Sequence, residues 1–161
     1  MFWRILQETE KRGGRMNRIN LICLGVQDME RSVKFYRDGL GFQTDETSDK
    51  PDIIFFNSSG TKLELYPLEE LAKDIQADNP PVKNGFSGIT LAYNAKSRDE
   101  VDQVMELAVK AGAVIAKEPV DVFWGGYSGY FQDPDGYYWE VAYGADFQFD
   151  SKDMLDFGPR K

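Results

Sequence analysis

The chain has 161 residues, of which 42% are hydrophobic, so it holds enough apolar side chains for one core or for two small fused ones. Its net charge of −8 argues against nucleic acid partners, whose phosphates need a basic surface, and against an anionic membrane surface. The single cysteine, Cys23, gives no disulfide framework and no apolar run reaches the length of a membrane span, so we expect a cytoplasmic protein.

The first 15 residues differ in charge from the rest of the chain. They carry four basic and two acidic side chains, and a regular pattern begins only after Met16. We interpret residues 1–15 as an N-terminal extension upstream of a natural start at Met16. The alternative is a short helix that packs on the domain through Phe2, Trp3, Ile5 and Leu6.

The first half of the chain, residues 16–76, predicts a strand, a helix and further strands. Residues 18–26 alternate between two faces, which is typical of a strand. Asp28 then caps a helix whose apolar residues recur every three or four positions and which ends at Gly39 and Gly41. The remaining elements of this half are strands over 42–47, 53–56 and 61–66 and a short helix over 67–76.

A polar, proline-rich segment over residues 77–85 is the predicted linker, and the same order of elements restarts after it. Ser97 and Glu100 form a capping box that begins a helix ending at Gly112. We interpret the turn Asp133–Gly136 as structural and residues 145–161 as a tail that lies on the surface. The strands of this half are predicted over 86–93, 113–116, 127–132 and 138–143.

Both halves therefore have the order β-α-β-β-β, the first within 16–76 and the second within 86–144. One such half cannot cover both faces of its own sheet, so the two halves are expected to pair. We predict an α+β fold of two tandem βαβββ modules whose curved sheets pair around a shared cavity, lined by the faces that carry no helix.

Glu64 and Glu140 each interrupt an apolar strand, so each points to the face opposite its apolar neighbours. If both face the cavity, they are its main chemical groups, since a carboxylate withdrawn from water becomes a better proton acceptor. The alternative is a structural pair that bonds neighbouring side chains or water. Alternation adds Leu21, Cys23, Lys62, Tyr66, Gly88, Thr90 and Tyr138 to the lining, and a glycine-rich loop adds Trp124, Tyr127 and Tyr130.

These motifs resemble the vicinal oxygen chelate superfamily, which includes glyoxalase I, extradiol dioxygenases and bleomycin-resistance proteins. The resemblance covers about residues 17–143. It rests on Ile19–Ile22, Asp28–Tyr36, Gly39–Phe42 and Asp133–Gly136, followed by Trp139–Val141.

The resemblance implies that metal-dependent members hold their ligands at positions matching Leu21, Glu64, Gly88 and Glu140. The first and third of these are often histidine, and this chain has no histidine. Two carboxylates are a poor site for Zn²⁺ or Fe²⁺, so we expect no transition metal and no other cofactor. Two weaker alternatives are a hard divalent ion at Glu64 and Glu140, and Cys23 as a thiolate ligand rather than a packing residue.

We therefore expect a glyoxalase/bleomycin-resistance/dioxygenase-like protein that acts on a small molecule without a transition metal. In this hypothesis it is a lyase or isomerase with Glu64 or Glu140 as the base. One alternative is a non-catalytic protein that sequesters a planar or cationic drug or toxin, and another is a partner-binding domain with a vestigial site. The resemblance also implies a homodimer.

Overall fold

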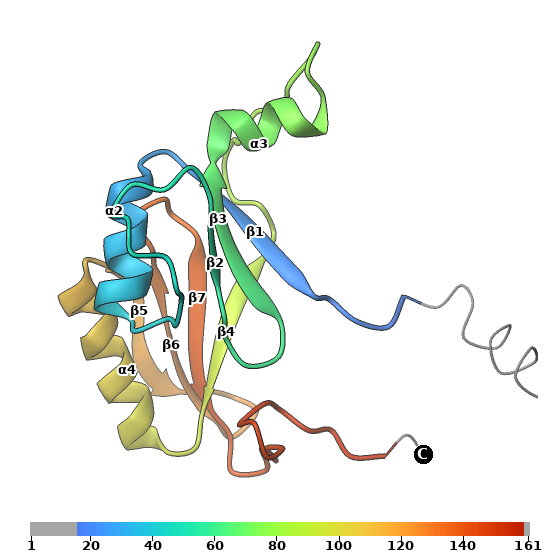
Figure 1. The fold of residues 1–161 in the computed structure, drawn as a ribbon. Helices are drawn as coiled ribbons and strands as arrows, with labels where there is room; N and C mark the ends of the chain where they lie inside the picture. Colours follow the sequence, from blue (N-terminus) through green and yellow to red (C-terminus); the bar gives the residue numbers. More distant parts are fainter. Residues whose placement is uncertain (1–15, 160–161) are drawn as a thin grey trace, which may run out of the picture.

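A computed structural model describes residues 16–159 and has an α+β fold with two separate curved sheets (Figure 1). The predicted fold class and the pairing of two sheets are thus confirmed. The expectation of an extension over residues 1–15 lies outside the described residues. Within those residues, no helix combines the length and the apolar character that a membrane span requires.

The first sheet has three strands in the order β1-β3-β2. Strand β1 runs parallel to β3, and β2 pairs with β3 in the antiparallel sense. Helix α3 packs over the end of β1, where a side chain at Gly25 would lie 2.7 Å from Leu68 Cδ1. The elements of this half are β1 (Leu21–Val26), helix α2 (Met29–Val33), the π-helix η1 (Lys34–Gly39), β2 (Ile54–Phe56), β3 (Lys62–Pro67) and α3 (Leu68–Ile75).

The second sheet has four strands in the order β4-β7-β6-β5. Half of the predicted capping box is formed: the Ser97 side chain accepts a hydrogen bond from the Glu100 backbone N–H, while the Glu100 carboxylate accepts from the Lys96 N–H instead of the Ser97 N–H. Gly112 ends the helix with a φ of 112°, a left-handed conformation that glycine tolerates. The elements of this half are β4 (Thr90–Ala95), α4 (Arg98–Ala111), β5 (Val114–Asp121), β6 (Tyr127–Gln132) and β7 (Tyr138–Tyr143).

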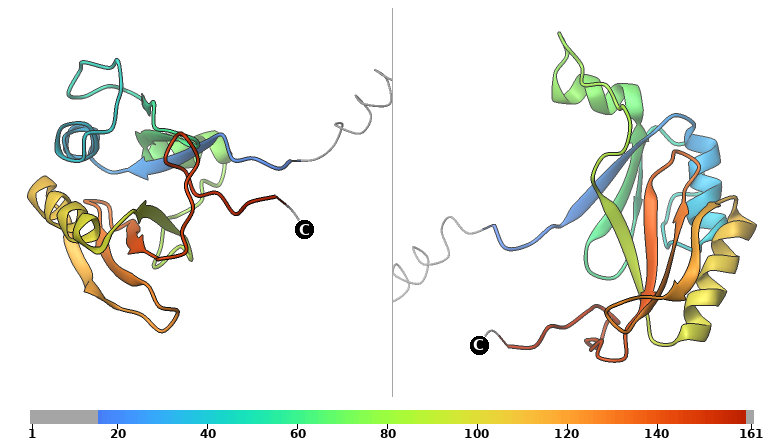
Figure 2. Two further views of the ribbon diagram at one scale, coloured as in Figure 1. Left: turned by 90° about the horizontal axis from the view of Figure 1, so that it is seen from below. Right: turned by 180° about the vertical axis from the view of Figure 1, so that it is seen from behind.

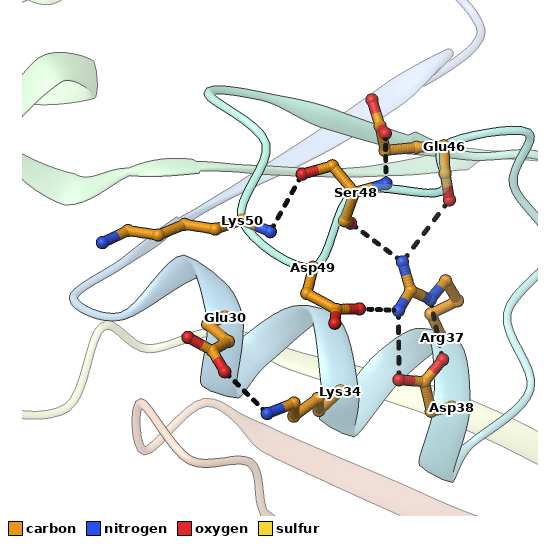
Figure 3. Close-up of polar contacts among 8 residues, drawn as sticks. All are labelled: Glu30, Lys34, Arg37, Asp38, Glu46, Ser48, Asp49 and Lys50. Atoms are coloured by element: carbon orange, nitrogen blue, oxygen red, sulfur yellow. Dashed lines mark hydrogen bonds and ion pairs between the residues drawn. The ribbon is translucent and has the colours of Figure 1, made fainter.

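The strand predicted over residues 42–47 is not formed, so the first half has one strand fewer than predicted. Figure 3 shows the reason: Arg37 on η1 holds this stretch against the helix. Its guanidinium donates hydrogen bonds to the Ser48 carbonyl at 2.9 Å and to the Asp49 carboxylate at 2.6 Å. A third bond reaches the Glu46 carbonyl at 3.4 Å. The segment therefore follows the helix instead of the edge of β2.

A single hydrophobic core joins both sheets to the helices α2, η1 and α4 and contains residues from all of these elements. Tyr36 and Phe42 occupy its centre, where their rings contact Phe56 of β2 and Trp139 of β7 at centroid distances of 5.7–6.2 Å. Figure 2 shows α2–η1 and α4 side by side on the same side of the two sheets. The helices approach closely at Gly39, where any side chain would overlap Ala111.

The turn Asp133–Gly136 connects the two halves, in agreement with its predicted structural role. Asp133 is buried and accepts hydrogen bonds from the Tyr36 hydroxyl at 2.6 Å and from the Tyr137 N–H at 2.8 Å. Asp135 accepts from the Ser32 hydroxyl at 2.8 Å and pairs with Arg31 at 3.2 Å. Each carboxylate of the turn thus fixes a helix of the other half.

Candidate functional site

Glu64 lies in the middle of β3, on the sheet face that points away from the core. Its neighbours Leu63 and Leu65 are buried in the core, and alternation along the strand turns Glu64 to the other side. The strand register places Cys23 of β1 and Phe55 of β2 directly beside it. Glu64 is only 8% exposed although Phe55 is 52% exposed, so the carboxylate is sheltered within an apolar surface.

Cys23 is the immediate polar neighbour of Glu64. Burial, the negative charge of Glu64 and a hydrogen bond to Glu64 together raise the pKa of the Cys23 thiol to about 12. The thiol therefore stays neutral at physiological pH and serves as a donor to the carboxylate. A neutral thiol is a poor nucleophile, so Cys23 serves here as a packing residue and a hydrogen-bond donor.

Glu140 occupies the corresponding position on β7 and is half-buried. The register places Ala92 of β4 on one side of it and Tyr130 of β6 on the other. Burial, the charge of Glu140 and a hydrogen bond to Glu140 raise the pKa of the Tyr130 hydroxyl, which thus remains a donor at neutral pH. The two glutamates therefore each have one neutral donor, a thiol in one sheet and a phenol in the other.

The expected single cavity containing both glutamates is not formed within the chain. One core contains the apolar residues of both central strands, Leu63 and Leu65 of β3 and Trp139 and Val141 of β7. Each sheet therefore turns its helix-covered face toward this core. Glu64 and Glu140, at the alternating positions, point away from that core on two different sheets. The helix-covered faces of the two sheets share one core because the rings of Tyr36 and Phe42 contact residues of both sheets.

The register separates the other predicted lining residues into two groups. Leu21, Lys62 and Tyr66 share the face of Glu64, and Thr90 and Tyr138 share the face of Glu140. Gly88 precedes β4, and Thr90 is the residue that corresponds to Leu21, so the expected match between Leu21 and Gly88 is wrong.

Two aromatic residues of the predicted lining lie elsewhere. Tyr127 faces α4, where its hydroxyl donates to Asp102 at 2.8 Å. Trp124 stacks on Phe147 of the tail at 6.0 Å and lies directly over Gly126. Neither residue therefore joins Glu140. The contacts of both residues indicate that this part of the glycine-rich loop packs structurally.

A cavity of about 640 Å³ lies on the core side, between the sheets. Ile22, Leu63, Leu91 and Trp139 form its apolar walls, and the tail segment Lys152–Leu155 lies over its mouth. Of the predicted set only Lys62 joins this lining, because its ammonium group turns to the Ser58 carbonyl at the β2–β3 turn and away from Glu64. The sequence contains one indication that the tail contacts this cavity: Met154 and Leu155 are adjacent apolar residues within an otherwise acidic tail.

Comparison with known proteins agrees with this architecture. The profile of the Glyoxalase/Bleomycin resistance protein/Dioxygenase superfamily matches residues 18–141. The chain belongs to this superfamily. A glyoxalase-related enzyme from Fulvimarina pelagi has the same fold with a TM-score of 0.79 and 28% identity, over 89% of this chain and 100% of that one.

Two curated members of the superfamily resemble parts of the chain. The probable chloroplastic lactoylglutathione lyase of Arabidopsis thaliana is 29% identical over 121 residues, which are 72% of this chain and 33% of the lyase. The mitochondrial methylmalonyl-CoA epimerase of Mus musculus is 37% identical over 59 residues, 34% of this chain and 33% of the epimerase. The chain thus spans about a third of each relative.

The side chains do not fit the metal site of metal-dependent members of the superfamily. The four corresponding positions are Leu21, Glu64, Thr90 and Glu140, and only the carboxylates among them are good ligands. Within residues 16–159, no three His, Cys, Asp or Glu side chains converge on one point. The donor set therefore lacks the nitrogen or sulfur ligands that a transition metal prefers.

Proposed function

We propose that the protein acts on a small carbonyl compound without a transition metal, and that Glu64 is the proton acceptor. The observation that carries this proposal is the sheltered carboxylate of Glu64, which is 8% exposed on an otherwise open apolar surface. No ion pair formed within residues 16–159 involves Glu64. A buried carboxylate whose neighbour is a neutral thiol and not a cation is costly to the fold, which favours a chemical role for it.

The reaction follows from the groups on this face. The Glu64 carboxylate removes a proton from the carbon beside a carbonyl, and the electron pair of that C–H bond moves to the carbonyl oxygen as an enolate. Tyr66 lies two residues away on the same face, where its hydroxyl can donate a hydrogen bond to the enolate oxygen. Return of the proton to the other side of the carbon gives an epimer, and return to an adjacent atom gives an isomer.

The surroundings of Glu64 also support a homodimer. Phe55 and Leu21, which are 52% and 41% exposed, flank the carboxylate, and burying them on a second chain would be favourable. In this arrangement the outer face of the β1-β3-β2 sheet of one chain meets the outer face of the β4-β7-β6-β5 sheet of the other. Glu140 of the second chain then lies opposite Glu64 of the first, and two nearby carboxylates share protons readily.

Hydrogen–deuterium exchange tests the proposed base. The two curated relatives are named for reactions of lactoylglutathione and methylmalonyl-CoA, both thioesters with a C–H bond beside the carbonyl. Each is incubated with the protein in D₂O, and the α-proton signal is followed by NMR. We expect exchange of at least one of them with the natural protein and a loss of at least roughly 100-fold with Glu64→Gln, the usual weight of a general base.

Two further variants complete the test. Glu69→Gln changes an exposed glutamate on α3 and should exchange like the natural protein. Exchange that survives both Glu64→Gln and Glu140→Gln would rule out a carboxylate base. Absence of exchange with every probe, together with measurable binding, would instead favour the sequestering alternative.

A further inference from the structure

We propose that the cavity between the sheets is a second ligand site, and that it binds a small organic anion with an aromatic or branched apolar body. This site is separate from the Glu64 and Glu140 faces, since it lies on the core side of the same strands. The cavity has apolar walls, an excess of lysine at its rim, and a hairpin of the tail across its mouth.

The walls of the cavity are apolar and come from both sheets. Ile22 and Leu63 line it from the first sheet, and Leu91 and Trp139 line it from the second. Phe42 also lines the cavity, and its ring centroid lies 6.0 Å from that of Trp139. The volume of about 640 Å³ lies in the range of roughly 300–1,000 Å³ that small-molecule sites occupy.

The rim carries positive charge although the chain as a whole has a net charge of −8. Lys62, Lys96 and Lys152 line the cavity against Glu100 and Asp153. The three lysines exceed the two acids by one charge, 3 − 2 = +1. A local excess of lysine in an acidic protein favours an anionic partner at this position.

The acids of the rim are already bonded to neighbours. Glu100 accepts hydrogen bonds from the Tyr93 hydroxyl and the Lys96 N–H, each at 2.6 Å, and Asp153 pairs with the Lys96 ammonium. Among the described residues 16–159, the Lys152 ammonium has no acceptor. Lys152 is thus the cation available to a ligand.

The tail crosses the mouth as a short hairpin that touches both sheets. A bridge between Phe149 and Leu155 forms it, and the Asp150 carboxylate accepts hydrogen bonds from the turn, which lower the pKa of Asp150. Met154 packs on the β2–β3 turn, where a side chain at Gly60 would lie 2.8 Å from its Cε. The pair formed by Asp153 and Lys96 attaches the hairpin to the second sheet, so Lys152 is held at the opening.

A matched series of probes tests both the anion and the apolar body. Naphthalene-2-carboxylate, its carboxamide and 2-naphthylmethylammonium share one ring system and differ in charge, and binding is measured by calorimetry and by quenching of tryptophan fluorescence. We expect the carboxylate to bind at least about tenfold more tightly than the amide, the equivalent of roughly 1.4 kcal/mol, and the cation to bind most weakly.

Variants locate the binding. Lys152→Gln should weaken carboxylate binding about fivefold and leave amide binding unchanged, while Lys50→Gln, which alters an exposed lysine away from the cavity, should change neither. Leu91→Trp enlarges a half-buried side chain of the cavity wall on β4 and should abolish binding of both while the circular dichroism spectrum is retained.

Three results would overturn the proposal: equal binding of carboxylate and amide, equal binding by natural protein and Lys152→Gln, or binding that persists in folded Leu91→Trp. Failure here is distinguishable from failure of the proposed function. Glu64→Gln should keep carboxylate binding, and Lys152→Gln should keep the exchange of thioester protons.

Discussion

The Tyr36 hydroxyl is the polar centre of the contact between the two halves, and its removal gives the sharpest test of the fold. Tyr36 is completely buried. Its hydroxyl donates to Asp133 at 2.6 Å and accepts from the Trp139 indole N–H at 3.1 Å. Tyr36→Phe keeps the ring and the core volume, so the variant removes two hydrogen bonds without creating a cavity.

The cost can be worked from these two bonds. A hydrogen bond to a charged group contributes about 1.5–3 kcal/mol, and a buried donor left without a partner costs about 1–3 kcal/mol. We expect Tyr36→Phe to lower the free energy of unfolding by about 2–4 kcal/mol, a large share of the roughly 5–15 kcal/mol of a typical domain. Urea denaturation followed by tryptophan fluorescence and far-UV circular dichroism measures this change.

The matched control is Tyr66→Phe, because the Tyr66 hydroxyl makes no hydrogen bond within residues 16–159 and the residue is half-buried. Its effect should stay within about 0.5 kcal/mol. A loss below about 1 kcal/mol for Tyr36→Phe, or a loss no larger than that of the control, would refute the assigned role of the hydroxyl.

The burial of Tyr36 also makes the free energy of unfolding depend on pH in the alkaline range. Desolvation, the charge of Asp133 and the hydrogen bond to it raise the pKa of Tyr36 well above its ordinary value. Tyrosine in the unfolded chain ionises near pH 10, while Tyr36 in the folded chain keeps its proton, so stability is complete below about pH 10 and falls above it. Stability measured from pH 8 to 11 should fall less steeply in Tyr36→Phe than in the natural protein.

Three further variants test particular contacts. Gly39→Ala should destabilise the fold by about 1–3 kcal/mol in urea denaturation, because its side chain overlaps Ala111, and Ala111→Gly should recover part of the loss. Since the pKa of Cys23 is about 12, its alkylation by iodoacetamide at pH 8 should be far slower in the folded protein than in urea, and Glu64→Gln should accelerate it; equal rates would contradict the burial. Arg37→Ala should speed amide hydrogen exchange over residues 43–50 and leave β1 and β3 unchanged.

Strand periodicity predicted which face each glutamate occupies, but not which faces of the two sheets meet. Alternation in β3 and β7 separates Leu63 and Trp139 from Glu64 and Glu140, and the structure has the same separation. The pairing of two sheets is decided by side chains that come from elsewhere. Here Tyr36 is that side chain, and nothing in its helical spacing distinguishes a core position within one half from a position between halves.

The two local errors have physical causes of the same kind. Residues 42–47 alternate like a strand, yet bonds from Arg37 to the following residues hold the segment on the helix, a competition that strand propensity does not include. The predicted equivalent of Leu21, Gly88, lies two residues before the actual one, Thr90. Because a shift of two residues keeps the same face of the strand, alternation alone cannot detect it. Only the register, which places Thr90 beside Tyr138 as Leu21 lies beside Lys62, identifies the equivalent residue.

The two proposed sites lie on opposite faces of the same two strands, and this geometry limits how independent they can be. Leu63 lines the inner cavity while its neighbour Glu64 lies on the outer face, and Trp139 and Glu140 repeat the arrangement. Consecutive residues of a strand share one rigid backbone, so a ligand that moves Leu63 or Trp139 also moves a glutamate. A cavity ligand would therefore alter the position of the proposed base without touching it, because the two contact opposite faces of the same strand.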